Sequence, residues 1–336
     1  MKVSAKTENT GMFQRSGLSA PFFTPNRHKY ILKANYNDPS HCRNVVYADV
    51  WAEMVQSRAR LPRELTVLSN YGAADGFPVS VYLNDEFHGL YTLTLHKDDD
   101  LFGIEDGKKQ ALLILNDASS EEAYFRAEAS FGLGSPWEIE FCGTENTDWV
   151  EAKLNELIAF LRDSDENTFR KNLSRYPDVD AAIDYLIALY TPGLPAHAAE
   201  DLLPVCYSPN DAWICSHYDM HDAFSAGDSG TFLPKKNGST WDSATGSLLW
   251  DRILNTFYED ICRRYAKLRR DILQPEKIGA AIDAYIAQIP DAVYAAEAEV
   301  NGTAPFTEDT VTEMHTFLHK QIALFDTIFT YERTGK

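Results

Sequence analysis

The chain has 336 residues, of which 44% are hydrophobic and 12% aromatic, and this composition excludes a disordered protein. Its formal net charge of −19 excludes nucleic acid as a partner, because phosphate binding requires clustered Lys and Arg, and it disfavours an anionic membrane surface. The five cysteines include no Cys-x-x-Cys pair, so we expect reduced thiols rather than a zinc site. The first nine residues hold no apolar run, so we expect no signal peptide and a cytoplasmic protein.

The first half of the chain is predicted to be mainly β. Residues 1–28 are polar and are expected to form an N-terminal arm without regular structure. Alternating or apolar runs predict strands at residues 29–35, 79–83, 90–95, 111–115 and 137–141. The second and third runs are joined by turn-forming residues, which indicates a β-hairpin. Asp38-Pro39-Ser40 is typical of a helix start, and the predicted helix extends to about residue 55.

The second half is predicted to be helical. Apolar residues at helical spacing indicate helices at about 149–161, 169–176, 181–190, 247–272, 276–289 and 307–330. Residues 212–217 are expected to form one short strand, and a long loop follows up to Gly246. We therefore predict an α+β protein with two lobes, a β-rich half at residues 29–145 and a helical half at 146–336. A cleft between two such lobes is a natural ligand site.

Two carboxylates stand where the predicted strand at 212–217 gives way to the loop. Asp219 and Asp222 could bind a divalent metal, since hard cations prefer several oxygens from a loop fixed by a rigid element. The alternative is that the two aspartates at the strand end stabilise a turn and expose their charges to solvent. The residues alone leave both interpretations open.

Three segments resemble the CotH family, which are spore-coat-protein-type kinases with an atypical protein-kinase-like fold. The first contains Ala34-Asn35-Tyr36, Asp38-Pro39-Ser40 and Arg43-Asn44. The second runs from Asn70-Tyr71-Gly72 through Gly76-Phe77-Pro78 to Gly89-Leu90-Tyr91. The third, Tyr218-Asp219-Met220-His221, is similar to the family's Tyr/Trp-Asp-x-Asp metal motif. The resemblance is closest to a divergent branch of phage and prophage proteins, often associated with tails, in which Gly-Leu-Tyr-Thr leads into Lys-Asp. It therefore adds the virion as a second expected location.

The resemblance implies a site that binds Mg²⁺ and ATP, but several positions depart from the family pattern. Ala196 stands where the family has its catalytic Asp, and His197 and Glu200 replace an Asn and a Lys. Asp201 replaces a metal-binding Asn and could still bind magnesium. His221 stands at the second Asp of the metal motif, and Asp222 follows it directly. The metal ligands implied by the resemblance are thus Asp219, Asp201 and Asp222, and no catalytic residue is assigned.

The resemblance also implies that Lys33 and Arg43 face the nucleotide phosphates. For Arg43 the alternative is a buried salt bridge or hydrogen bonds that hold the following helix, and it is the one we favour. Lys97 precedes three aspartates and is most simply part of a solvated charged turn. Asn35, Asp38 and Ser40 are expected to hold the turn between strand and helix. Gly72, Gly76 and Gly89 are expected to serve backbone geometry.

Two hypotheses follow from the sequence. In the first, the chain is a CotH-like pseudokinase or weakened kinase that uses ATP and Mg²⁺, with a protein Ser or Thr hydroxyl as acceptor. In the second, the same fold serves as a structural or binding module of a phage tail or similar assembly. The expected partner is a protein substrate or an assembly partner, and the second hypothesis adds a homo-oligomer. The missing Asp at position 196 disfavours rapid phosphoryl transfer, because positioning of the acceptor supplies most of the catalysis.

Overall fold

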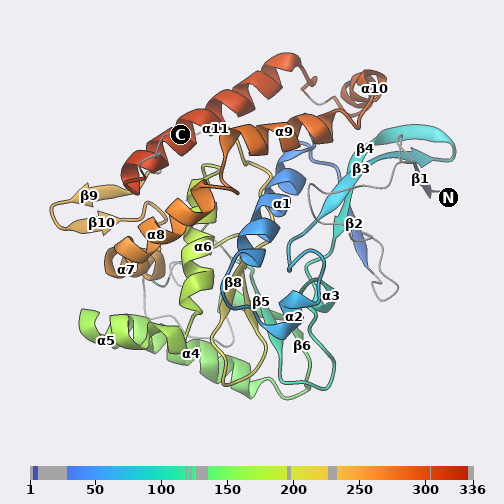
Figure 1. The fold of residues 1–336 in the computed structure, drawn as a ribbon. Helices are drawn as coiled ribbons and strands as arrows, with labels where there is room; N and C mark the ends of the chain where they lie inside the picture. Colours follow the sequence, from blue (N-terminus) through green and yellow to red (C-terminus); the bar gives the residue numbers. More distant parts are fainter. Residues whose placement is uncertain are drawn as a thin grey trace.

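The computed structural model describes the backbone of residues 3–6, then residues 29–117, 120, 123, 125, 135–194, 198–225, 233–302 and 304–331. A four-stranded antiparallel sheet lies at one side of the molecule, with the strand order β1-β3-β4-β2 (Figure 1). Its strands are β1 (Val3–Lys6), β2 (Tyr30–Lys33), β3 (Gly76–Leu83) and β4 (Glu86–Leu95). The prediction of an arm without regular structure at residues 1–28 is wrong at Val3–Lys6, which pairs with β3.

The predicted hairpin is confirmed, with a tighter turn than expected. β3 and β4 are joined by Asn84 and Asp85, whose φ angles are 51° and 72°. Positive φ at both central residues is the geometry of a two-residue type I′ turn, which matches the twist of the two strands. In β4, the main-chain N–H of Leu90 donates to the Glu297 carboxylate at 2.5 Å. A Cβ at Gly89 would lie 2.9 Å from that carboxylate, so this position requires glycine.

A second antiparallel sheet, with the order β6-β5-β7-β8, joins the two halves of the chain. Its strands are β5 (Ala111–Leu115), β6 (Trp137–Cys142), β7 (Leu202–Cys206) and β8 (Ile214–His217). β5 belongs to the first half and pairs with β7 of the second half through Ala111–Cys206 and Leu112–Val205. The strands at 111–115, 137–141 and 212–217 are confirmed within two residues, whereas β7 is an additional strand.

Helices fill most of the second half and cross the centre of the molecule (Figure 1). The helices before residue 200 are α1 (Arg43–Gln56), α2 (Arg63–Thr66), α3 (Asp99–Phe102), α4 (Asp148–Asp163), α5 (Glu166–Asn172), the 3₁₀ helix η2 (Leu173–Arg175) and α6 (Val179–Tyr190). The later helices are α7 (Leu248–Thr256), α8 (Tyr258–Arg269), α9 (Pro275–Ile286), α10 (Asp291–Asn301) and α11 (Glu308–Ile328). The described architecture is therefore α+β, with a β-rich first half and a helical second half.

Several predicted boundaries are corrected by the structure. α1 begins at Arg43, because Asp38 to His41 form a turn held by their own hydrogen bonds instead of the first helical turn. The single helix predicted at 247–272 is two helices, α7 and α8, with Phe257 between them. The predicted loop up to Gly246 contains a small hairpin of β9 (Lys235–Asn237) and β10 (Thr240–Asp242). α10 was not expected from the sequence.

α1 and α6 contact each other and lie in the core, and most of their side chains are buried. Every residue from Ala181 to Tyr190 is buried, as its nearly continuous apolar sequence predicts. The five cysteines form no disulfide, in agreement with the prediction of reduced thiols. In the described part of the chain no helix combines the length and the apolar character needed to cross a bilayer.

Candidate functional site

Lys33 and Asp219 form an ion pair between elements that lie 186 residues apart in the sequence. Lys33 ends β2 and pairs with Thr92 of β4, so both side chains leave the same face of the sheet. Thr92 is buried and its hydroxyl contacts that of Tyr285 at 3.2 Å, which shows that this face is directed towards the helical half. Asp219 follows the end of β8 by two residues, and its Oδ2 lies 2.6 Å from the Lys33 Nζ. The pair thus joins the two sheets.

The other oxygen of Asp219 is engaged by His221. The distance from His221 Nδ1 to Asp219 Oδ1 is 3.1 Å, and His221 Nε2 lies 3.4 Å from Asp222 Oδ2. We call Lys33, Asp219, His221 and Asp222 the Asp219 cluster. It contains two cationic and two anionic groups when His221 is protonated, so its charges are balanced internally.

The pKa values of the cluster follow from these contacts. Burial would raise the pKa of Asp219, but the hydrogen bond with His221 and the Lys33 ammonium outweigh it, so the pKa lies well below its usual range. The hydrogen bond with Asp219 raises the pKa of His221 to about 9 against the opposing effect of burial. Asp222 and Asp201 raise it further, so Asp201 lies near the cluster. At neutral pH, His221 is therefore an imidazolium.

Asp201 reaches the cluster because of the pairing between β7 and β8. Leu202 pairs with His217, so Asp201, one residue before β7, lies at the same end of the sheet as Tyr218 and Asp219. The Asp201 side chain is buried. The three carboxylates predicted as metal ligands are therefore gathered at one end of the second sheet. Among the described residues, no three Asp, Glu, His or Cys side chains lie close enough together to hold a metal ion between them.

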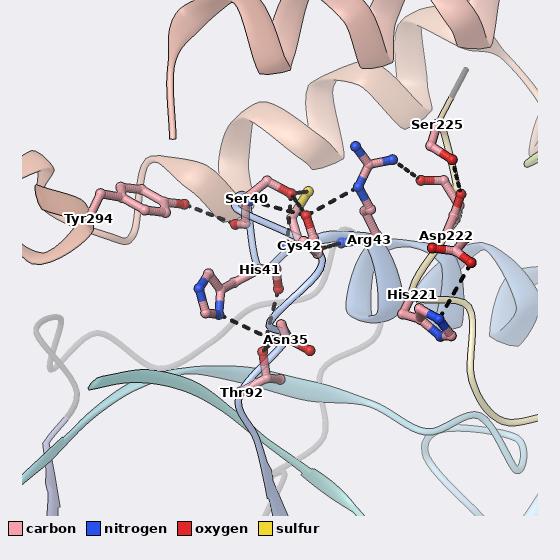
Figure 2. A network of polar contacts seen from close by, with 12 residues as sticks. Asn35, Ser40, His41, Cys42, Arg43, Thr92, His221, Asp222, Ser225 and Tyr294 are labelled. Atoms are coloured by element: carbon pink, nitrogen blue, oxygen red, sulfur yellow. Dashed lines mark hydrogen bonds and ion pairs between the residues drawn. The ribbon is translucent and has the colours of Figure 1, made fainter. Parts of the chain in front are cut away.

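The loop that carries Asp219 is fixed to the start of α1. The main-chain N–H of Met220 donates to the Asn44 Oδ1 at 2.5 Å. The Arg43 guanidinium donates to the carbonyl of Ala223 and also binds the Asp38 carboxylate at 3.1 Å. Figure 2 shows the Arg43 side chain reaching the loop that contains Asp222 and Ser225. Arg43 thus forms the salt bridge of the alternative interpretation, and its contact with phosphate stays a prediction.

The turn before α1 is held by the residues that the sequence analysis assigned to this role. The Asp38 carboxylate accepts hydrogen bonds from the main-chain N–H groups of Ser40 and Arg43, at 3.0 and 3.1 Å. Asn35, whose φ is 48°, donates to the Thr92 hydroxyl at 2.7 Å and ties the turn to β4 (Figure 2). These contacts position Arg43 and Asn44, which in turn position the Asp219 loop.

Sequence reasoning missed the contacts of three residues near the Asp219 cluster. Asn44 belongs to the Arg43-Asn44 motif, but nothing in the sequence indicated that its side chain accepts from the Met220 N–H. Tyr218 places its hydroxyl 3.1 Å from the Leu95 carbonyl, and Lys97 lies over the Tyr218 ring. Ala196 and His197 lie outside the described residues, so the structure does not test their predicted roles.

The geometry agrees with a comparison against known families. A family model described as CotH kinase protein matches residues 13–323. No curated protein matches the chain. The match spans the second sheet, all strands of the first sheet except β1, and most of the helical half, and it includes each member of the Asp219 cluster. The α+β architecture fits a kinase-like fold. The chain belongs to the CotH kinase family.

Proposed function

We propose that this chain binds ATP with magnesium at the Asp219 cluster and that its phosphoryl transfer to protein Ser or Thr is weakened or lost. The Lys33–Asp219 ion pair is the observation that carries the proposal. A kinase site needs a cation that faces the phosphates and a carboxylate that binds magnesium, and the two must lie next to each other. Lys33 and Asp219 lie 2.6 Å apart and would supply this cation and this carboxylate.

The donor set suits magnesium. Mg²⁺ prefers oxygen ligands and is usually held by one or two carboxylates together with substrate phosphates. Asp219, with Asp201 and Asp222 near it, would supply such carboxylates. When bound, the ion neutralises charge on the phosphates during transfer. The Asp219 oxygens bind Lys33 and His221 in this structure, so the chain's own cations hold the carboxylate until a ligand competes for it.

The expectation of weak transfer depends on position 196. An alanine methyl group can neither accept a proton from a hydroxyl nor orient it, and acceptor positioning is a large part of kinase catalysis. His221 adds a second departure, because an imidazolium replaces a carboxylate beside Asp219. Binding of nucleotide and transfer of phosphate can therefore be separated in this chain.

A second candidate function is a structural or binding module of a phage tail or similar assembly. The internal charge balance of the Asp219 cluster favours it, since such a site needs no ligand to compensate its carboxylates. This candidate predicts self-association in solution, which light scattering measures directly. A monomer that binds MgATP would support the first candidate instead.

The test is calorimetric titration of MgATP into the full chain and into Asp219→Asn. We expect micromolar binding that requires magnesium and weakens at least about tenfold in the variant, because a carboxylate that binds the metal has been removed. Asp283→Asn is the matched control, since Asp283 is an exposed carboxylate that pairs with His315 between α9 and α11. Absence of binding by the parent chain at millimolar MgATP would refute the proposal. Equal loss in both variants would show that the effect is not specific to the site.

A further inference from the structure

The run of aspartates after Lys97 predicts a solvated charged turn, and the structure places Lys97 in a bend that is only partly exposed. Lys97 follows β4 by two residues and its side chain is half-buried. The Lys97 Nζ lies 5.8 Å from the centroid of the Tyr218 ring. The Lys33 Nζ lies 5.4 Å from the same centroid. The ammonium groups of Lys33 in β2 and of Lys97 after β4 thus lie over the same aromatic ring.

The Tyr218 ring is a fixed spacer between these two cations. Its hydroxyl donates to the Leu95 carbonyl at 3.1 Å, which ties the end of β8 to the end of β4. Burial, with the nearby Asp219 and Asp98 carboxylates, raises the pKa of Tyr218, so the phenol stays neutral. A neutral ring attracts ammonium groups through its π electrons and leaves their N–H donors available to a ligand.

The two lysines differ in whether a neighbouring carboxylate pairs with their charge. Lys33 is paired with Asp219 at 2.6 Å. Lys97 makes no ion pair with any residue that the structure describes, and its neighbour Asp98 lies 3.4 Å from His96 Nδ1 instead. Glu140 also acts on the Tyr218 phenol electrostatically, together with Asp219 and Asp98. Within the described ranges, Asp219 thus compensates the charge of Lys33 directly, whereas no carboxylate pairs with Lys97.

We propose that Lys97 binds the polyphosphate of the nucleotide, with Tyr218 holding its ammonium group beside Lys33. The inference rests on the proposed function, because it names a ligand contact of that same site. A polyphosphate keeps excess negative charge even with magnesium bound, and lysine binds phosphate as a point charge. Since Asp219 already compensates Lys33, Lys97 supplies the additional attraction.

The experiment compares MgATP binding by the full chain with that of Lys97→Gln, Lys97→Arg and Lys109→Gln. Lys109 is an exposed lysine before β5 and has no contact with Tyr218, so it controls for the change in net charge. We expect Lys97→Gln to weaken binding about tenfold, as for loss of one charged phosphate contact. Lys97→Arg should keep most of the affinity, and Lys109→Gln should not change it. Thermal melting of each variant checks that the fold is intact.

A second titration uses tripolyphosphate without metal, so that failure of this inference differs from failure of the proposed function. If MgATP binds and depends on Asp219 but Lys97→Gln binds equally well, the inference is overturned and the function stands. If MgATP does not bind but tripolyphosphate binds and requires Lys97, the inference stands as a polyphosphate site and the nucleotide function falls. If the parent chain binds neither ligand, both are overturned.

Discussion

Two carboxylates in this protein are each flanked by two cationic side chains, and they differ in how far water reaches them. Asp184 of α6 is fully buried and binds Arg58 and Arg264, each at 2.6 Å, with side-chain exposures of 4% and 15%. Asp219 has 30% of its side chain exposed, and its partners Lys33 and His221 have 22% and 37%. Buried guanidinium pairs cannot exchange partners without a large desolvation cost, whereas a half-exposed group can.

The contacts around Arg264 show what the buried arrangement does. Its guanidinium also donates to the Met54 carbonyl and to the Ser57 hydroxyl, both at 2.9 Å. It thus supplies a hydrogen-bond donor to a main-chain carbonyl in the last turn of α1. Asp184 therefore connects α1, α6 and α8. The same pattern of charges thus joins helices where water is excluded. Where water has access, at Asp219, the pair can exchange partners, as the proposed function requires.

The largest effect is expected from breaking the buried cluster. Asp184→Ala leaves two guanidinium groups without their carboxylate, and loss of one partner of a buried ion pair costs about 3–5 kcal/mol. Urea denaturation measures this change in the free energy of unfolding. Asp184→Asn keeps the shape and serves as a second variant if the alanine protein does not fold. A loss below about 1 kcal/mol in both would contradict a structural role for the cluster.

A smaller effect is expected from releasing the loop that carries Asp219. Asn44→Ala removes the acceptor of the Met220 N–H, and an unsatisfied donor costs about 1–3 kcal/mol. We also expect weaker MgATP binding, because the loop positions Asp219. Denaturation and calorimetry on the same protein separate the two effects. Unchanged affinity together with reduced stability would show that Asn44 supports the fold alone.

Asp219→Asn should change stability less than either of these. The ion pair is partly solvated, and such pairs contribute about 1 kcal/mol or less. Urea denaturation of Asp219→Asn and Asp184→Asn applies the same Asp-to-Asn change to both carboxylates. It therefore tests whether the exposed site contributes less to the free energy of unfolding than the buried one. Similar losses at both sites would mean that water access does not distinguish them.

The smallest effect is expected in how the contribution of His221 to the free energy of unfolding changes with pH. Because its folded-state pKa of about 9 lies above the ordinary value of 6.5, its ion pairs stabilise the fold fully below pH 6.5 and are lost as pH rises through 9. The difference in unfolding free energy between the parent chain and His221→Gln should therefore shrink over this range. NMR titration should show the pKa of His221 falling towards 6.5 in Asp219→Asn. A pKa near 6.5 in the parent chain would refute the contact.

Local features of the fold were predictable because they depend on local patterns. The alternation in β3 and β4 and the apolar run of α6 identify these elements without knowledge of their neighbours. α10 was missed because its Ala- and Glu-rich sequence has only a weak apolar stripe. β7 was missed because it follows a Pro- and Gly-containing segment and is only five residues long.

The candidate site was predictable in its residue types but not in its contacts. Asp219 and Asp222 stand at a strand end, and Lys33 ends a strand, so each was visible as a candidate. Their association depends on the packing of two sheets, and no short sequence window contains that information. The same reason applies to Lys97. Its aspartate neighbours suggest a solvated side chain, and its contact with the ring of Tyr218, more than 100 residues later, cannot be inferred from them.

The pairing of β5 with β7 has a practical consequence for dissecting this protein. A helical fragment expressed from residue 146 onward would keep β7 and β8 but lose β5 and β6, and β7 would present an open edge. Open edges of buried, apolar strands recruit other copies and promote aggregation. Cloning of the two halves as separate genes should thus yield insoluble material, whereas their co-expression should allow the sheet to form between fragments.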